Sequence, residues 1–413
     1  MKYWFKKTQE ELKTIVFNAL NNNANYTTQN ILGIPASHLN EDVFPLDAAF
    51  LKEAPFMTSL VKNPNHIGCH TLNKSEGYFS GTQEIEKELI ALCAVDILKG
   101  KPLEHDGYVA SGGTEANIQA IWTYRNYFMQ EHQATLDEIC IVCSEDSHYS
   151  MDKSSNLLCI SNIKIPNAVE DRSLSKADIL AQVTAAKSSG KKYFIVIVNM
   201  MTTMFGTVDD IDLYVESLKA VNVDFKIHVD GAFGGFYYPF SNEENTLNFS
   251  NKYVTSFTLD AHKMAQAPYG TGVFLIKKGF MKYVNTEEAS YVVGQDSTLI
   301  GSRSGANAIA VWMILMKMGP FGWFERIHIL KQRTHWLCKQ LDDLAIAYYH
   351  FPTSNIVTIK SAFINAEIAK KFGLVPDNHL NPKWFKIVVM SHVTIEKLML
   401  LIQAFKHGVI PKV

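Results

Sequence analysis

The amino-acid sequence predicts an α/β protein, in which a mostly parallel β-sheet carries helices on both faces and a small α+β domain follows. The first observation is that short apolar runs, rich in β-branched residues, alternate with longer helical patterns such as 114–128 and 175–187. Strands that alternate with helices favour a parallel sheet, because each crossover connection can hold a helix. The apolar runs lie at 107–111, 139–144, 193–200, 226–232, 254–260 and 272–278.

Two further observations concern the end of this alternation. No helical pattern separates the runs 254–260 and 272–278, so we expect an antiparallel step between them. Beyond about residue 307 the pattern changes to two helices, two strands and a last helix, at 307–319, 323–344, 355–361, 385–392 and 394–408. We therefore expect an N-terminal arm (1–66), a large domain (67–306) and a small C-terminal domain (307–413).

Composition narrows the class of protein. The 413 residues are 47% hydrophobic and 19% charged, with a formal net charge of −2, which predicts a globular chain without the basic surface of a nucleic-acid binder. Neither a signal peptide nor an apolar stretch of about 18 residues is present, so no membrane span and a cytoplasmic location are expected. Cys140 and Cys143 form a CxxC, but inside a predicted strand they face opposite sides and indicate buried, reduced thiols.

The strongest functional signal is a lysine and an aspartate at the ends of successive predicted strands. Asp230 lies in HVDGAFGG and Lys263 in SFTLDAHKM. Ligands bind at strand ends in open α/β sheets. Pyridoxal 5′-phosphate (PLP) needs a lysine amine for its aldehyde and a carboxylate for its ring nitrogen. Either residue alone would more often be an ordinary surface side chain, so their combination carries the prediction.

Two more segments follow predicted strands. Ser111, Gly112, Gly113 and Thr114 precede a helix, and the backbone N–H groups of such a turn can hold a phosphate. An ordinary helix N-cap through Ser111 or Thr114 is the alternative. His148 follows the run 139–144, and its flat ring could stack on a cofactor, although a loop histidine without a role is the simpler interpretation.

With these residues in view, the chain resembles the group II PLP-dependent amino-acid decarboxylases from about residue 80 to its end. HVDGAFGGFYYPF, SFTLDAHKM and SGGTEAN are similar to segments of short archaeal tyrosine/aspartate decarboxylases. SHYS, YVVGQDSTLIGSRSG and VTIEKL resemble bacterial histidine and plant serine decarboxylases. The resemblance implies the aspartate aminotransferase fold (fold type I) with a seven-stranded sheet.

The resemblance also implies roles for single residues. Lys263 would hold PLP, Asp230 would bind the pyridine nitrogen, and His148 would stack on the ring with Ala232 beneath it. The remaining cofactor contacts would come from Gly112, Gly113, Thr114, Thr202 and His262. Two positions depart from the family pattern, because Met201 replaces a glycine and Gly231 replaces an alanine. These departures bear on substrate fit more than on the chemistry.

A neighbouring subunit enters the same expectation. Tyr291 resembles a loop tyrosine that completes the site of the partner subunit, and a phenol can return the proton that replaces CO2. His148 is the other candidate for this proton. Ser302 and Arg303, in GSRSG, resemble residues that reach the partner's phosphate region. The resemblance therefore implies a homodimer with shared active sites.

The implied reaction removes the α-carboxylate of an L-amino acid as CO2 and leaves an amine. Tyrosine and histidine are the favoured substrates, and aspartate, glutamate and serine stay open. A carbon–carbon lyase of the sphingosine-phosphate-lyase type and a non-catalytic PLP-fold scaffold are the alternatives. A metal site at His66, Cys69 and His70 is also conceivable, but no fourth ligand is evident, and we expect no metal.

Overall fold

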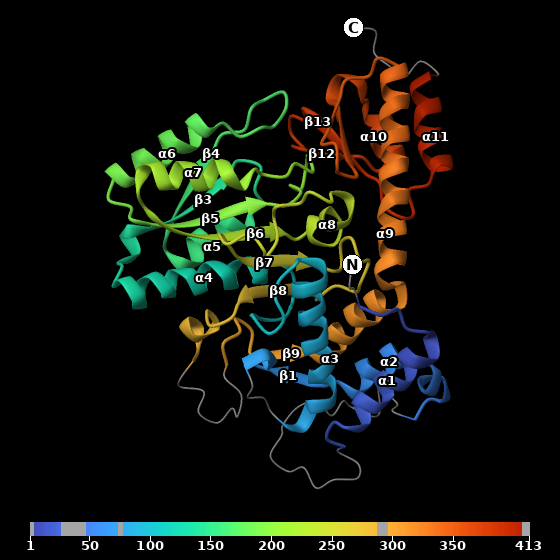
Figure 1. Ribbon diagram of the computed structural model, residues 1–413. Helices are drawn as coiled ribbons and strands as arrows, with labels where there is room; N and C mark the ends of the chain where they lie inside the picture. The colour runs from blue at the N-terminus through green and yellow to red at the C-terminus, as the bar shows by residue number, and fades with distance from the viewer. Residues whose placement is uncertain (1–3, 26–46, 73–76, 287–295, 407–413) are drawn as a thin grey trace.

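Seven strands form the central sheet of the computed structural model, which describes residues 4–25, 47–72, 77–286 and 296–406 (Figure 1). All strands run parallel except β8, which lies antiparallel to both of its neighbours, β2 and β7. The mostly parallel sheet and the antiparallel step are thus confirmed. In spatial order the strands are β2 (His105–Ala110), β8 (Gly272–Lys277), β7 (Val254–Asp260), β6 (Asp224–Gly231), β5 (Tyr193–Asn199), β3 (Ile139–Ser144) and β4 (Ser161–Ile165).

Helices cover both faces of this sheet. Successive residues of a strand point to opposite faces, so a strand that is apolar throughout has two faces to bury. On β3, Cys140 and Val142 pack in the core with α6 (Lys176–Ser188) and α7 (Ile211–Val221), whereas Ile141 and Cys143 pack with α4 (Gly113–His132) and α5 (Ser150–Leu158). The two cysteines of the CxxC therefore lie buried on opposite faces, as predicted.

Strand β4 has no counterpart among the six runs read from the sequence. It lies at the edge of the sheet, and four of its five residues are exposed or half-buried. Its sequence, SNIKI, is consequently too polar to stand out as an apolar run.

A long helix, α9 (Gly305–Asp343), contains the two helices predicted at 307–319 and 323–344, which meet at a kink. The φ angle of Gly319 is 65°, and Pro320 follows without a backbone N–H. The chain's first described residues bind the carbonyls at this kink: Trp4 Nε1 donates to the oxygen of Leu315 at 2.8 Å, and Lys7 N donates to Met316 at 2.9 Å. The N-terminal segment therefore supplies hydrogen-bond donors to the carbonyl oxygens near the kink.

The C-terminal part holds a four-stranded antiparallel sheet. Its order is β10 (Tyr348–His350), β11 (Ile356–Lys360), β13 (Trp384–Val388) and β12 (Val375–Pro376), with α10 (Ala366–Phe372) and α11 (Ile395–Ala404). The two longer strands and α11 match the predicted elements. The domain boundaries themselves stay a prediction, and α9 begins at Gly305, just before the expected boundary.

The N-terminal elements and one short helix complete the structure. A small two-stranded sheet pairs β1 antiparallel with β9. The elements are α1 (Gln9–Asn21), α2 (Pro55–Lys62), β1 (Asn65–Ile67), α3 (Ser80–Ala91), α8 (Tyr238–Ser241) and β9 (Ser302–Ser304). Within the ranges that the structure describes, no helix has the length and apolar character needed to cross a membrane.

Candidate active site

The predicted residues meet where the parallel strands end. Asp230 lies near the end of β6, Lys263 follows β7, and His148 follows β3, all at the carboxyl edge of the sheet. These three side chains line one small cavity together with two other predicted residues, Thr202 and Ala232. The full lining is His148, Asn199, Met201, Thr202, Thr203, Asp230, Ala232, Phe233 and Lys263.

Asp230 is buried and held from two sides. Its Oδ1 accepts a hydrogen bond from the backbone N–H of Ala232 at 3.1 Å, and its Oδ2 accepts one from Asn117 Nδ2 at 2.9 Å. Both contacts are to donors, so they fix the two carboxylate oxygens as acceptors. A carboxylate fixed in the wall of the cavity can accept a hydrogen bond from a protonated ring nitrogen.

Lys263 lies beside an acidic residue to which sequence analysis gave no role. Its Nζ is 3.4 Å from Oδ2 of Asp260, the last residue of β7. Burial alone would raise the pKa of Asp260, but a hydrogen bond from His262 and the charge of Lys263 bring it below its ordinary value. Asp260 Oδ1 and His262 Nδ1 lie 3.2 Å apart, so the buried carboxylate is paired with both His262 and Lys263. Asp260 thus fixes the positions of the two residues expected to contact the cofactor.

The glycine turn before α4 has the form of an anion cradle. Gly112 is the N-cap of the 20-residue helix, and no side chain caps it, so the alternative of a Ser111 or Thr114 cap does not hold. Glu115 instead accepts from the backbone N–H of Ser111 at 2.7 Å and shapes the turn. A side chain at Gly113 would bring its Cβ within 2.9 Å of Asp260 Oδ2. The turn therefore lies against the Lys263 segment and requires glycine there.

His148 is half-buried at the cavity, where its orientation is fixed by Ser150. The ring Nδ1 lies 2.9 Å from Ser150 Oγ and 3.2 Å from the backbone N–H of the same residue. Burial lowers the pKa of His148, with opposing effects from the charges of Asp230 and Lys263. The imidazole is therefore mainly neutral near pH 7, which suits a ring that packs against a flat cofactor.

The two departures from the family pattern have different structural settings. Met201 is buried in the cavity wall with a φ of 71°, a left-handed conformation that glycine adopts more easily. Next to it, Thr202 Oγ1 lies 2.7 Å from Thr207 Oγ1 and closes a tight turn. At Gly231 a Cβ would approach the carbonyl oxygen of Thr258 to 3.1 Å, and glycine avoids this close contact between β6 and β7.

Arg303 does not match the expectation that it reaches a partner's phosphate region. Its guanidinium is buried, forms an ion pair with Glu86, and donates to the backbone oxygens of Gly68 and Val109. The charge of Arg303 is therefore neutralised within its own chain, by a buried partner. Ser302 is exposed on β9 and lies within hydrogen-bond distance of Asn65, outside the cavity lining, and Tyr291 lies outside the described residues.

The histidines of PNHIGCHTL belong to the same buried network. His66 Nδ1 lies 2.7 Å and His70 Nε2 3.1 Å from Oε2 of Glu86, while Cys69 Sγ instead contacts Gly107. His66, His70 and Glu86 are close enough to surround a cation. A separation of 2.7 Å is that of a hydrogen bond, however, and Arg303 already neutralises the Glu86 carboxylate. The geometry thus supports an ion-pair cluster better than a metal centre.

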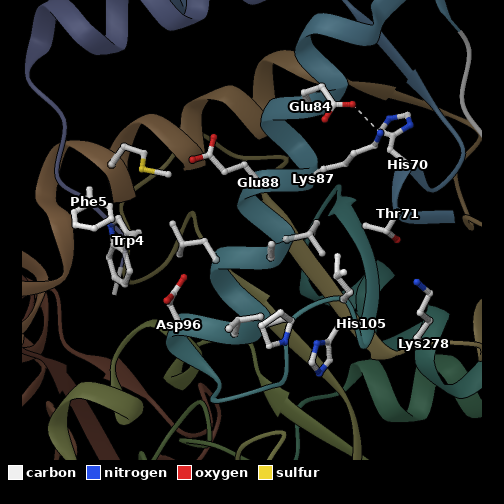
Figure 2. A pocket seen from close by; sticks show the side chains of 18 of the residues that line it. Trp4, Phe5, His70, Thr71, Glu84, Lys87, Glu88, Asp96, His105 and Lys278 are labelled. Carbon is white, nitrogen blue, oxygen red and sulfur yellow. Dashed lines mark hydrogen bonds and ion pairs between the residues drawn. The ribbon is translucent and has the colours of Figure 1, made fainter. Parts of the chain in front are cut away.

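A second, larger cavity lies apart from this site. This cavity has a volume of about 800 Å³ and runs along α3. Figure 2 shows Trp4 and Phe5 at one end of it and Lys278 at the other. Lys87 and Glu84 form an ion pair at 2.8 Å in its wall. None of the residues predicted to hold a cofactor lines it. The smaller cavity is therefore the candidate active site in spite of its size.

The residues in the site fit PLP. The cradle at Gly113, the amine of Lys263 and the carboxylate of Asp230 correspond to the phosphate, aldehyde and ring nitrogen of that cofactor. Sequence reasoning missed Asn117, Glu115 and Asp260, although all three lie within the segments SGGTEAN and SFTLDAHKM. The signal that could have found them is their position beside residues already singled out.

Comparison with known proteins agrees with this site. Residues 84–342 match the pyridoxal-dependent decarboxylase conserved domain. The tryptophan decarboxylase of Clostridium sporogenes (strain ATCC 15579) is 51% identical over 404 residues, which cover 97% of each chain. A probable L-tyrosine/L-aspartate decarboxylase of Methanocella arvoryzae is 30% identical over 88% of this chain and 96% of its own.

Solved structures show the same fold. L-methionine decarboxylase from Streptomyces sp. 590 superposes with a TM-score of 0.72 at 19% identity, covering 97% of this chain and 94% of that one. At this identity the likeness concerns the fold alone. It confirms the α/β architecture, and the seven strands of the central sheet match the number that the family resemblance implies.

Proposed function

This chain belongs to the pyridoxal-dependent decarboxylase family, and from that premise we propose that it decarboxylates an aromatic L-amino acid, with tryptophan the first candidate. The family establishes a PLP-dependent carboxy-lyase. The observation that carries the choice of tryptophan is the 51% identity, over nearly the full length, to a tryptophan decarboxylase. Tyrosine and histidine, which the sequence favours, are to be compared with it directly.

The cavity lining supports a substrate without a negative side chain. Lys263 is the only lysine or arginine among the described residues that line it, and Met201 and Phe233 add apolar surface. A second carboxylate on the substrate would require a further cation, since a buried charge is costly without a partner. Aspartate and glutamate are therefore less suited to this site than an aromatic side chain.

PLP, when bound, supplies the electron sink that stabilises the carbanion left by departing CO2. Lys263 would hold the cofactor and exchange it with the substrate amine. Asp230 would keep the ring nitrogen protonated, and His148 would cover the ring and exclude water. The backbone N–H groups at Gly113 and Thr114 would bind the phosphate, with Gly112, His262, Thr202 and Ala232 completing the contacts.

The test is CO2 release from each of the twenty amino acids, together with the absorbance spectrum of the protein with PLP. Wild type should release CO2 from tryptophan faster than from tyrosine or histidine and show a visible absorbance band that depends on Lys263. Lys263→Ala should lose both. A band without CO2 release would instead favour the lyase alternative, and absence of the band would remove PLP chemistry altogether.

We also infer a homodimer in which Tyr291 and Ser302 act in the partner's site, as the family resemblance implies. The test mixes two inactive variants, Lys263→Ala and Tyr291→Phe, after joint unfolding and refolding. If the site is shared, each mixed dimer regains one intact site and the mixture recovers about a quarter of wild-type activity. No recovery in a mixture that is shown to contain mixed dimers would place Tyr291 in its own subunit's site, whereas full activity of Tyr291→Phe by itself would place it outside the chemistry. The cytoplasmic location stays a prediction.

A further inference from the structure

Asn117 connects two residues of the proposed site. It lies in the second turn of α4, and its side chain is buried. Its Nδ2 donates to Oδ2 of Asp230 at 2.9 Å and to Oγ of Ser150 at 3.0 Å, and its Oδ1 lies 3.0 Å from Nε2 of His228. The side-chain amide of Asn117 thus connects Asp230, the proposed partner of the pyridine nitrogen, to Ser150, which orients His148.

The direction of each hydrogen bond follows from chemistry. An amide oxygen can only accept, so His228 Nε2 carries a proton and donates to Asn117. The amide N–H groups can only donate, so Asp230 Oδ2 and Ser150 Oγ must both accept from Asn117. Burial lowers the pKa of His228 to about 3, which keeps this histidine neutral. The network therefore leaves Asn117 one consistent arrangement.

This arrangement extends to the ring of His148. Its Nδ1 faces the backbone N–H of Ser150 at 3.2 Å, and a backbone N–H is always a donor, so Nδ1 carries no proton. Ser150 Oγ accepts from Asn117 and can direct its own hydrogen to the same Nδ1 at 2.9 Å. The proton of the neutral imidazole is therefore on Nε2.

We propose that Asn117 is a positioning residue, which fixes the carboxylate of Asp230 and, through Ser150, holds His148 as its Nε2–H tautomer. The inference rests on the proposed function, because it concerns the residues that would contact the cofactor. Two consequences follow. The ring nitrogen always faces an acceptor, and the stacked histidine always presents the same edge to the site.

The decisive variant is Asn117→Asp, which has nearly the same size but replaces a donor by an acceptor. Placed beside Asp230, the new carboxylate replaces the donated hydrogen bond by the repulsion of a like charge, so Asp230 is no longer held toward the ring nitrogen. We expect the affinity of the apoprotein for PLP to fall by about tenfold or more, measured by absorbance titration. The matched control is Thr123→Ala, which changes a buried polar residue on the same helix whose Oγ1 donates to the backbone oxygen of Gln119. This variant should bind PLP like wild type.

A second variant separates the contact of Asn117 with Asp230 from its connection through Ser150 to His148. Ser150→Ala removes the contact to His148 and leaves Asn117 on Asp230, so PLP affinity should stay within about twofold of wild type while kcat falls. Histidine-selective ¹⁵N NMR of the apoprotein, with His148 assigned through His148→Gln, should show protonated Nε2 in wild type and a mixture of tautomers in Ser150→Ala.

Wild-type PLP affinity in Asn117→Asp, or a protonated Nδ1 on His148 in wild type, would overturn the inference. These outcomes are distinct from failure of the proposed function, in which wild type itself would bind no PLP or release no CO2. If Asn117→Asp does not fold, the NMR comparison of wild type with Ser150→Ala still decides the tautomer.

Discussion

Arg303 and Glu86 form an ion pair that lies almost wholly out of contact with water, with 5% and 2% of their side chains exposed. Burial alone would raise the pKa of Glu86, but the charges of Arg303 and His66 bring it well below its ordinary value. Arg303→Met should therefore strand a buried carboxylate and lower the free energy of unfolding by about 3–5 kcal/mol. Urea denaturation of the apoprotein measures this change.

An exposed ion pair on the same protein provides the control. Lys176 and Glu216 lie 2.6 Å apart with about half of each side chain in solvent. Lys176→Met should leave the unfolding curve close to that of wild type, since water already screens both charges. Equal effects of the two substitutions would contradict the role given to burial.

The glycine turn predicts a contrast between adjacent positions. A Cβ at Gly113 would lie 2.9 Å from Asp260 Oδ2 and 3.1 Å from the Cβ of Ala232, whereas at Gly112 the nearest atom is 4.0 Å away. Gly113→Ala should therefore lower the melting temperature of the apoprotein, and Gly112→Ala should leave it nearly unchanged. Differential scanning calorimetry compares the two. A larger effect at Gly112 would show that the turn is built differently.

Met201 predicts an unusual order of stability. Its φ of 71° costs about 1–2 kcal/mol for a residue with a Cβ and little for glycine. Met201→Gly and Met201→Ala both remove the buried side chain, but only the glycine variant also relieves the backbone. Met201→Gly should therefore unfold at a higher urea concentration than Met201→Ala, the reverse of the usual order at an ordinary position. The usual order would mean that this backbone carries no strain.

Asp209 predicts a dependence of stability on pH. Burial raises its pKa to about 7; hydrogen bonds from Asn199 oppose this effect, while the charges of Asp146 and Asp230 add to it. The pKa of an aspartate in the unfolded chain is about 4. Between these values the folded protein binds the extra proton, so the contribution of Asp209 to stability falls as pH rises from about 4 to about 7 and then stays constant.

Asp209→Asn removes that titration while its amide oxygen can still accept from Asn199. The variant should gain stability relative to wild type as pH is raised from 4.5 to 8, measured as the difference between urea midpoints. A difference that does not change with pH would show that Asp209 is ionised throughout this range.

The strands and the main site residues could be predicted because their signals are local. An apolar run of β-branched residues marks a buried strand; Asp230 lies near the end of one such run and Lys263 lies shortly after another. The partners of Asn117 were beyond reach, since Ser150 and Asp230 lie 33 and 113 residues away along the chain. The expectation that Arg303 reaches a partner's phosphate region did not fit for the same reason, because its counter-charge, Glu86, is 217 residues away along the chain.

The contact between Trp4 and the kink of α9 also constrains the order of folding. The two partners are separated by 311 residues, so this hydrogen bond can form only after the chain as far as Leu315 has been synthesised. Joining the N-terminal segment to α9 is therefore a long-range step of folding, and a substitution of Trp4 would act on that step.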